Sequence, residues 1–365
     1  MTHPPFGTFF LPGPTEVRAE VLAAMAQPMM PHRGAQFESL FIRLQDGLRH
    51  VFRTTRPVYV STSSATGLME AAIRCAPAGP ILALVNGAFS ERFAAIARGC
   101  GRETRVILAP LGTVHELDDV EAALAANRHA AMTVVHSETS TGALADIAAL
   151  AALAHRYGTA ILVDSVTGIA GAPVETDAWQ LDFVLTGSQK ALALPPGLAF
   201  AVASENYLEQ AHTALARGLY FDIVEFEEYA QRNQTPNTPA LPLLYAADVQ
   251  LAAIRTEGIE TRWARHTAMA QATWEWTDQC RANGIDIGIL APAGARSPTV
   301  SAITVPPGVT GGQIVKRVAE QGFVIGGGYG ALKDRTFRIG HMGDHNVAGL
   351  GGCLDACENA LHAGR

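Results

Sequence analysis

The chain has 365 residues, and a rule of roughly 150 residues per domain predicts two domains. Hydrophobic residues make up 48% and charged residues 17%, which excludes a disordered or fibrous protein. The net charge of -7 and the lack of a basic tract argue against a nucleic-acid partner. No run approaches about 18 uninterrupted apolar residues, so we expect no membrane-spanning helix.

Two features of the sequence predict a cytoplasmic protein. The N-terminal segment lacks a charged stretch followed by a long apolar run, so it does not resemble a signal peptide. The five cysteines are scattered and odd in number, as is typical of reduced, buried thiols. Cys353 and Cys357 are spaced i, i+4 on an expected helix, and this pair alone supplies too few ligands for a metal site.

From residue 57 onward, short β-rich runs alternate with helical stretches. The runs are almost continuously apolar, which is typical of strands that are covered on both faces. This alternation predicts an α/β fold with a doubly wound, mostly parallel sheet. In chain order, the expected strands cover residues 57–61, 81–87, 103–108, 131–138, 159–164, 182–187 and 198–204. The expected helices run to about residue 76 and over 89–98, 116–126 and 146–158.

The chain changes character after residue 205. A helix is followed by the polar segment 231–242, whose repeated prolines exclude a helix there, and a long helical stretch starts near residue 246. Further strands are expected at 299–306, 323–327 and 336–340, and helices at 311–322 and after 346. We therefore expect an N-terminal arm (1–20), a large domain (21–255) and a smaller C-terminal α+β domain (256–365).

Ligands of doubly wound sheets bind at the carboxyl ends of the strands, so we expect the site in the loops at 61–66, 86–89, 136–142, 164–167 and 186–190. Lys190 lies in the last of these loops. It is one of only three lysines, and its segment TGSQKALALPPG is small and apolar. Burial lowers the pKa of a lysine, and the neutral amine can form a Schiff base with an aldehyde. A lysine that extends to solvent or pairs with a buried acid is the alternative.

A buried acid and a small-residue loop fit the same interpretation. Asp164 ends the apolar run AILVD, where a carboxylate needs a cationic partner such as a protonated pyridine nitrogen. Taken alone, it fits a turn cap or a Mg²⁺ site equally well. The loop STSSATG (61–67) enters a helix, whose N–H groups and dipole favour an anion. The GxGxxG-like run at 326–332 opens no clear helix, so we discount NAD.

Two further side chains suit a site for a ring and a carboxylate. Phe89 follows a strand at the same edge of the sheet and could stack on a pyridine ring, or belong only to the core. Arg338 lies inside an apolar strand, where it needs an anion. That anion is either a substrate carboxylate or a carboxylate of the protein.

Together and in this order, these segments resemble class V aminotransferases of the pyridoxal-phosphate fold-type I group. The chain is most similar to the alanine/serine–glyoxylate aminotransferase family. The resemblance runs from about residue 9 to 360, and GSQKAL after VDS is its most specific part. The matching segments are LPGPTEV (11–17), NGAFSER (86–92), ETSTG (138–142), VDSV (163–166), GSQKALALPPG (187–197) and FRIG (337–340). The resemblance implies a large domain with a mostly parallel seven-stranded sheet and a smaller C-terminal domain.

The resemblance also implies the role of each site residue. Lys190 would bind pyridoxal 5'-phosphate as a Schiff base and shuttle the proton, and Asp164 would pair with the pyridine nitrogen. Arg338 would bind the substrate α-carboxylate, with His341 as a second anion donor or a structural residue. Phe89 would stack on the cofactor ring, Thr139 would contact its phenolic oxygen, and Val166 would be a further cofactor residue. The phosphate would be held by Ala65, Thr66 and Gln189. Thr235 and Thr238 would contact the phosphate of the neighbouring subunit.

The activity implied is transamination between a small amino acid, alanine or serine, and a small 2-oxo acid, glyoxylate or pyruvate. The implied assembly is a homodimer with shared active sites, and no metal is expected. His32 and Arg33 complicate the substrate, because such a pair holds the substrate phosphate in phosphoserine aminotransferases and also occurs in glyoxylate-using relatives. Phosphoserine transamination and a lyase or desulfurase on the same fold therefore remain alternatives, as does a non-catalytic binding protein.

Overall fold

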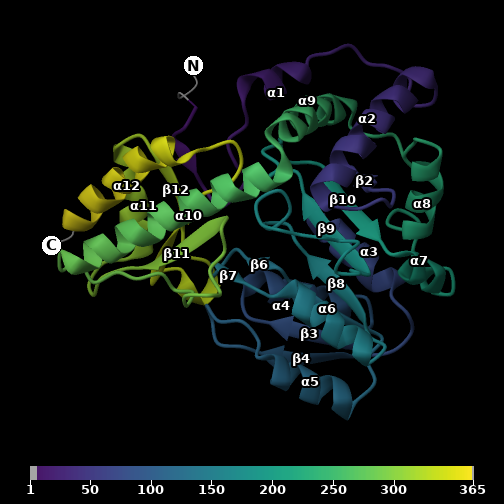
Figure 1. Ribbon diagram of the computed structural model, residues 1–365, viewed down its shortest axis with the longest axis horizontal. Helices are drawn as coiled ribbons and strands as arrows, with labels where there is room; N and C mark the ends of the chain where they lie inside the picture. Colours follow the sequence, from purple (N-terminus) through teal and green to yellow (C-terminus); the bar gives the residue numbers. More distant parts are fainter. Residues whose placement is uncertain (1–5, 364–365) are drawn as a thin grey trace.

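The structure is a computed structural model that describes residues 6–363. Its elements form two units that lie side by side, one around a seven-stranded sheet and one around a four-stranded sheet (Figure 1). Within the described residues, no helix is long and apolar enough to cross a membrane.

The large sheet has the strand order β2-β10-β9-β8-β5-β3-β4, and β10 is antiparallel to both of its neighbours. It contains the seven strands predicted from the apolar runs. Every residue of β3, β5, β8 and β9 is buried, whereas the edge strand β4 is partly exposed. The strands are β2 (Tyr59–Ser61), β3 (Ile81–Val85), β4 (Thr104–Leu108), β5 (Ala131–Val135), β8 (Ala160–Asp164), β9 (Phe183–Gly187) and β10 (Ala199–Ala203). The doubly wound, mostly parallel sheet is therefore confirmed.

Helices cover both faces of this sheet, which explains the continuous apolar runs. One face packs against α3 (Ala65–Cys75), α4 (Ala88–Gly99), α7 (Glu205–Ala211) and α8 (Ile223–Gln231). The opposite face packs against α2 (Ala35–Phe52), α5 (Leu117–Ala126), α6 (Ile147–Arg156) and α9 (Leu241–Glu257). Asp146 begins α6 as its N-cap, because its side chain accepts the Ala149 N–H at 3.0 Å. The short α1 (Ala19–Ala24) packs on α9.

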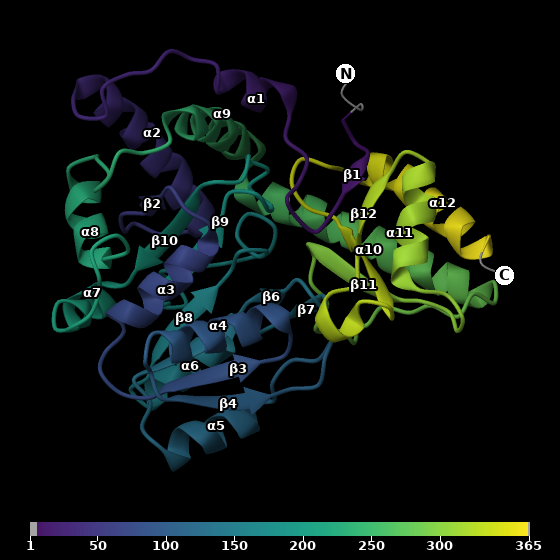
Figure 2. The ribbon, with the colours of Figure 1, turned by 180° about the vertical axis from the view of Figure 1, so that it is seen from behind.

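The smaller unit has the strand order β1-β12-β13-β11. Its helices α10 (Ile259–Ala282), α11 (Gly311–Glu320) and α12 (Val347–His362) share one apolar core with this sheet. Three of its strands were predicted: β11 (Val300–Thr304), β12 (Val324–Gly327) and β13 (Thr336–Gly340). The fourth, β1 (Phe9–Phe10), comes from the N-terminal segment and pairs in parallel with β12 (Figure 2). The domain boundaries given above stay a prediction.

Candidate active site

A cavity of about 330 Å³ lies at the carboxyl ends of β5, β8 and β9, and we call it the lysine cavity. Loops that follow five strands of the large sheet contribute to its wall, as the strand-end rule predicts. The structure brings together here the predicted residues Ala65, Thr66, Phe89, Thr139, Asp164, Val166, Gln189 and Lys190.

Lys190 is the one lysine on the described wall of the lysine cavity. Its side chain is buried, with 8% of the residue exposed, and Nζ donates a hydrogen bond to the Pro12 carbonyl. Burial, with a smaller contribution from the charge of Arg338, lowers the pKa of Lys190 to about 8, and the charge of Asp164 opposes this shift. Gly13, at φ +93°, leaves the lysine its space, because a Cβ there would overlap the Lys190 side chain.

Asp164 ends β8 and lies on the wall of the same cavity, with 2% of the residue exposed. Within residues 6–363, its side chain has one hydrogen bond: Oδ1 accepts the Val166 N–H at 2.9 Å. Burial raises the pKa of this carboxyl to about 7, against the effects of the Val166 hydrogen bond and of Lys190. A carboxylate this buried with a single donor can take a further cationic or N–H partner.

The start of α3 supplies the donors for an anion. Ser64 is the N-cap of this 11-residue helix and makes no side-chain capping bond. The first N–H groups of a helix have no partner within the helix, so Ala65 and Thr66 present theirs at the cavity wall. Gln189 lies beside this helix end, and its Oε1 would be 2.7 Å from a Cβ added at Gly187. The arrangement suits a phosphate.

Hydroxyl groups occupy the wall between β5 and β8. Thr139 Oγ1 and Thr167 Oγ1 are 2.5 Å apart, and both residues are buried on the cavity wall. His136 Nδ1 lies 2.9 Å from Ser165 Oγ, and the His136 N–H donates to the Asp164 carbonyl at 2.9 Å. Burial lowers the pKa of His136 to about 4, so this imidazole is neutral at ordinary pH. Thr167 and His136 lie in loops that the sequence analysis indicated, but were not among its named residues.

Arg338 reaches the site from β13 of the smaller unit. Its Nε donates to the Gly327 carbonyl at 2.8 Å, and its Nη1 donates to the Thr139 carbonyl at 3.0 Å. Within residues 6–363 it has no carboxylate partner, which leaves its charge for a ligand. Burial lowers its pKa. The predicted alternative of an ion pair inside the protein is therefore absent from the described residues.

Phe89 has a neighbour that the sequence analysis missed. Its ring stacks on Tyr329 with centroids 5.5 Å apart and an angle of 27° between the planes. Arg92 lies 5.1 Å above the Phe89 ring and donates to the Tyr329 hydroxyl at 3.3 Å. Tyr329 and Arg92 both belong to the cavity wall. The signal for Tyr329 was the glycine-rich run at 326–332, which had been weighed only as a dinucleotide motif.

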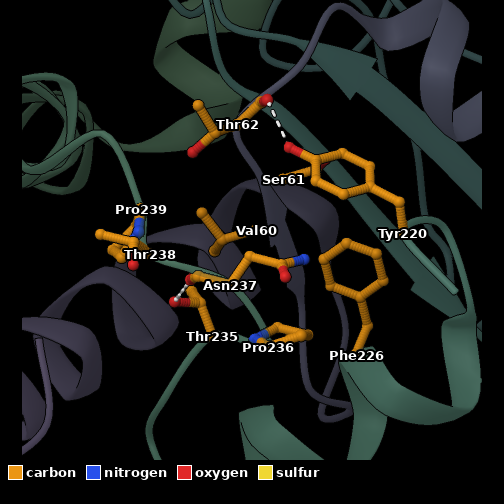
Figure 3. A pocket seen from close by; sticks show the side chains of 10 residues that line it. All are labelled: Val60, Ser61, Thr62, Tyr220, Phe226, Thr235, Pro236, Asn237, Thr238 and Pro239. Atoms are coloured by element: carbon orange, nitrogen blue, oxygen red, sulfur yellow. Dashed lines mark hydrogen bonds between the residues drawn. The ribbon is translucent and has the colours of Figure 1, made fainter.

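The other four predicted residues lie on a different surface. Thr235 and Thr238 line the pocket drawn in Figure 3, and His32 and Arg33 contact its segment 236–238. Arg33 Nη2 donates to the Pro236 carbonyl at 3.1 Å, and His32 Nε2 lies 3.5 Å from Thr238 Oγ1. Thr235 Oγ1 donates to a carbonyl two residues on, at 2.8 Å. This surface shares no lining residue with the lysine cavity. We call the group His32, Arg33, Thr235 and Thr238 the outer polar cluster.

Two features weighed from the sequence have structural partners instead. His341 is fully buried, with Nδ1 3.1 Å from the Pro298 carbonyl and Nε2 3.0 Å from Ser301 Oγ. Both ring nitrogens are engaged, so His341 is a structural residue rather than a free anion donor. Cys353 and Cys357 are buried in α12 within the core of the smaller unit.

Comparison with known proteins agrees with this geometry. The class-V aminotransferase family matches residues 10–329. The serine–glyoxylate aminotransferase of Methylorubrum extorquens is 32% identical, over 96% of this chain and 90% of that protein. The L-aspartate–glyoxylate aminotransferase of Paracoccus denitrificans is 33% identical, over 92% and 86%. The solved alanine–glyoxylate aminotransferase of Nostoc sp. matches with a TM-score of 0.92 and 30% identity, over 99% and 96%. The chain therefore belongs to the class-V aminotransferase family and is a fold-type I aminotransferase.

Proposed function

We propose that pyridoxal 5'-phosphate is the cofactor of this aminotransferase and that it binds in the lysine cavity. The observation that carries the proposal is that Lys190 and Asp164, both buried, line the same cavity. An aldehyde, a phosphate and a ring nitrogen each find a matching group there: an amine of lowered pKa, the start of α3, and a carboxylate with a single hydrogen bond. The residues thus fit the group.

Each residue on the cavity wall then has a defined task. Ala65, Thr66 and Gln189 would hold the phosphate, and Thr139 would donate to the phenolic oxygen. Phe89 and Val166 would cover the ring, and Asp164 would accept the N–H of the ring nitrogen. When bound, pyridoxal phosphate withdraws electrons from the substrate's α-carbon and carries the amino group between substrates.

The chain's own residues position the substrate and move the proton. Arg338 would hold the α-carboxylate of the donor, because its charge has no protein carboxylate beside it among the described residues. Lys190 would take the proton from the donor α-carbon through Nζ and return a proton to the α-carbon of the new amino acid. The pKa of about 8 makes Nζ a usable base near neutral pH.

We propose alanine or serine as donor and glyoxylate or pyruvate as acceptor. The names of the three similar proteins described above all include glyoxylate, whereas the donors in these names differ: serine, aspartate and alanine. Phosphoserine is disfavoured because the solved phosphoserine aminotransferases are only 15–21% identical to this chain, less than the relatives named for glyoxylate. A desulfurase is disfavoured because Cys353 and Cys357 are buried in the smaller unit.

The proposal includes a homodimer in the cytoplasm. Arg33 and Thr238 of the outer polar cluster are exposed in the single chain, which suits a surface that completes a neighbour's site. All five cysteines are unpaired, as is usual in a reducing compartment. Light scattering on the active enzyme tests the dimer: a fully active monomer would contradict the shared site.

The absorption spectrum of the purified protein tests the cofactor and the donor together. We expect a visible band from lysine-bound pyridoxal phosphate that L-alanine or L-serine bleaches and that glyoxylate restores. Lys190→Ala should lack the band and the turnover. No band after addition of pyridoxal phosphate would overturn the cofactor proposal, and a band bleached by L-aspartate or L-phosphoserine alone would overturn the donor.

A further inference from the structure

We propose that Tyr329 sets the upper size limit of the amino donor by separating the lysine cavity from an apolar cavity beside it. This inference rests on the proposed function, because it concerns the donor that transaminates in the lysine cavity. Among the residues that line either cavity, Tyr329 alone belongs to both walls. Its ring is therefore the partition between the two spaces.

The second space, which we call the apolar cavity, measures about 410 Å³. Its wall runs along the end of β3 and the edge strand β4 to the turn after Tyr329. Three leucines give it an apolar character, and Glu91 is the one Asp, Glu, Lys, Arg or His on its described wall. The apolar side chains are Val85, Leu108, Leu111 and Leu332, with Ala109 and Pro110 between them. Such a wall suits an aliphatic or aromatic group rather than a charged one.

Contacts on several sides fix the Tyr329 ring in this position. It stacks on Phe89, its hydroxyl accepts from Arg92, and the Arg338 guanidinium carbon lies 5.6 Å from its ring centroid. Two hydrogen bonds hold the backbone as well: the Gly328 N–H donates to the Thr336 carbonyl at 2.9 Å, and the Leu332 N–H donates to the Tyr329 carbonyl at 3.0 Å. The ring is thus a fixed wall, although 39% of the residue is exposed.

The contact with Arg338 links the partition to the donor. A donor whose carboxylate is bound by Arg338 lies next to the Tyr329 ring, so the ring limits the space for the donor's side chain. A methyl or hydroxymethyl group needs little space, whereas a four-carbon chain would meet the ring. Without the ring, the two cavities join, and a long apolar side chain can extend toward Leu111 and Leu332.

The test compares L-alanine with L-norleucine as donors, with glyoxylate as acceptor, in Tyr329→Ala and Tyr329→Phe. We expect Tyr329→Ala to raise the norleucine-to-alanine ratio of kcat/KM by about 10-fold or more, in line with the discrimination one or two methylenes give. Tyr329→Phe keeps the ring and loses only the hydroxyl, so its ratio should stay near that of the unchanged enzyme. If Tyr329→Ala does not fold, Tyr329→Val provides the same comparison.

A second substitution, at Leu111, fills the apolar cavity on the side away from the lysine cavity. Leu111→Trp in the Tyr329→Ala background should bring the ratio back down, because the indole occupies the apolar cavity; Leu111→Trp alone should leave alanine turnover unchanged. An unchanged ratio in Tyr329→Ala, with both donors still turned over, would overturn the inference. So would an equal rise in Tyr329→Phe. An unchanged enzyme that transaminates neither donor would instead count against the proposed function.

Discussion

The amine of Lys190 should titrate near pH 8 in the cofactor-free enzyme, because burial and the charge of Arg338 lower its pKa. At pH 7 an amine with a pKa of about 8 is about one-tenth neutral, whereas an ordinary lysine is neutral in roughly three molecules of ten thousand. Two substitutions should move the titration in opposite directions. Arg338→Met removes a cation and raises the pKa, and Asp164→Asn removes an anion and lowers it.

The scarcity of lysine makes this measurement simple. Lys316→Arg with Lys333→Arg leaves Lys190 as the sole lysine, so reductive methylation with ¹³C-formaldehyde labels it and the chain's amino terminus. The ¹³C signal is followed from pH 6 to 11, and Lys190→Arg in the same background identifies it by its loss. A midpoint at pH 10 or above would refute the effect of burial. A shift of both charge variants in the same direction would refute the assigned roles of their charges.

Three further substitutions test the remaining groups of the site. Asp164→Asn should lower kcat by roughly 10²–10³-fold while the cofactor still binds, since a preorganised charge is lost. Steady-state kinetics measure kcat, and the cofactor content of the variant is the control. A loss of activity that only follows a loss of bound cofactor would indicate a purely structural role. Arg338→Lys should raise KM for donor and acceptor roughly 10- to 100-fold, because loss of a charge-assisted hydrogen bond costs about 1.5–3 kcal/mol. An unchanged KM would contradict the assignment of Arg338 to the substrate carboxylate. Gly13→Ala should weaken cofactor binding, because its Cβ overlaps Lys190. Gly294→Ala is the matched control, because Gly294 has a similar φ of +90° and its new methyl meets open space; equal affinities would refute the steric argument.

The large sheet could be predicted because its strands are covered on both faces. Apolar runs such as AILVD are unbroken for this reason, and the helices between them have clear ends. The predicted strand 57–61 was two residues too long, since only Tyr59–Ser61 pair with β10. Strand β1 was missed because Phe9–Phe10 is too short to give a pattern, and its partner β12 lies more than 300 residues away in the chain.

In the site, the rare residues were easier to predict than the contacts between distant segments. Lys190 and Asp164 stood out because a charge in an apolar segment needs a chemical reason. The Pro12 carbonyl that accepts the Lys190 hydrogen bond could not be found, because it is a backbone group 178 positions away. Tyr329 was missed because the glycines around it suggested phosphate binding, whereas Gly328 serves a close approach to the Leu332 carbonyl.

The hydrogen-bond acceptors of Lys190 and Arg338 would link substrate binding to the basicity of the Lys190 amine in the proposed site. Lys190 donates to the Pro12 carbonyl, and Arg338 donates to the Gly327 and Thr139 carbonyls. These acceptors carry no net charge, so the field of Arg338 still acts on Lys190 and lowers its pKa. Under the proposed assignment, a substrate carboxylate bound at Arg338 would offset that field, so the pKa of Lys190 would rise when the α-proton is to be taken. A protein carboxylate paired with Arg338 would cancel the field permanently and remove this coupling.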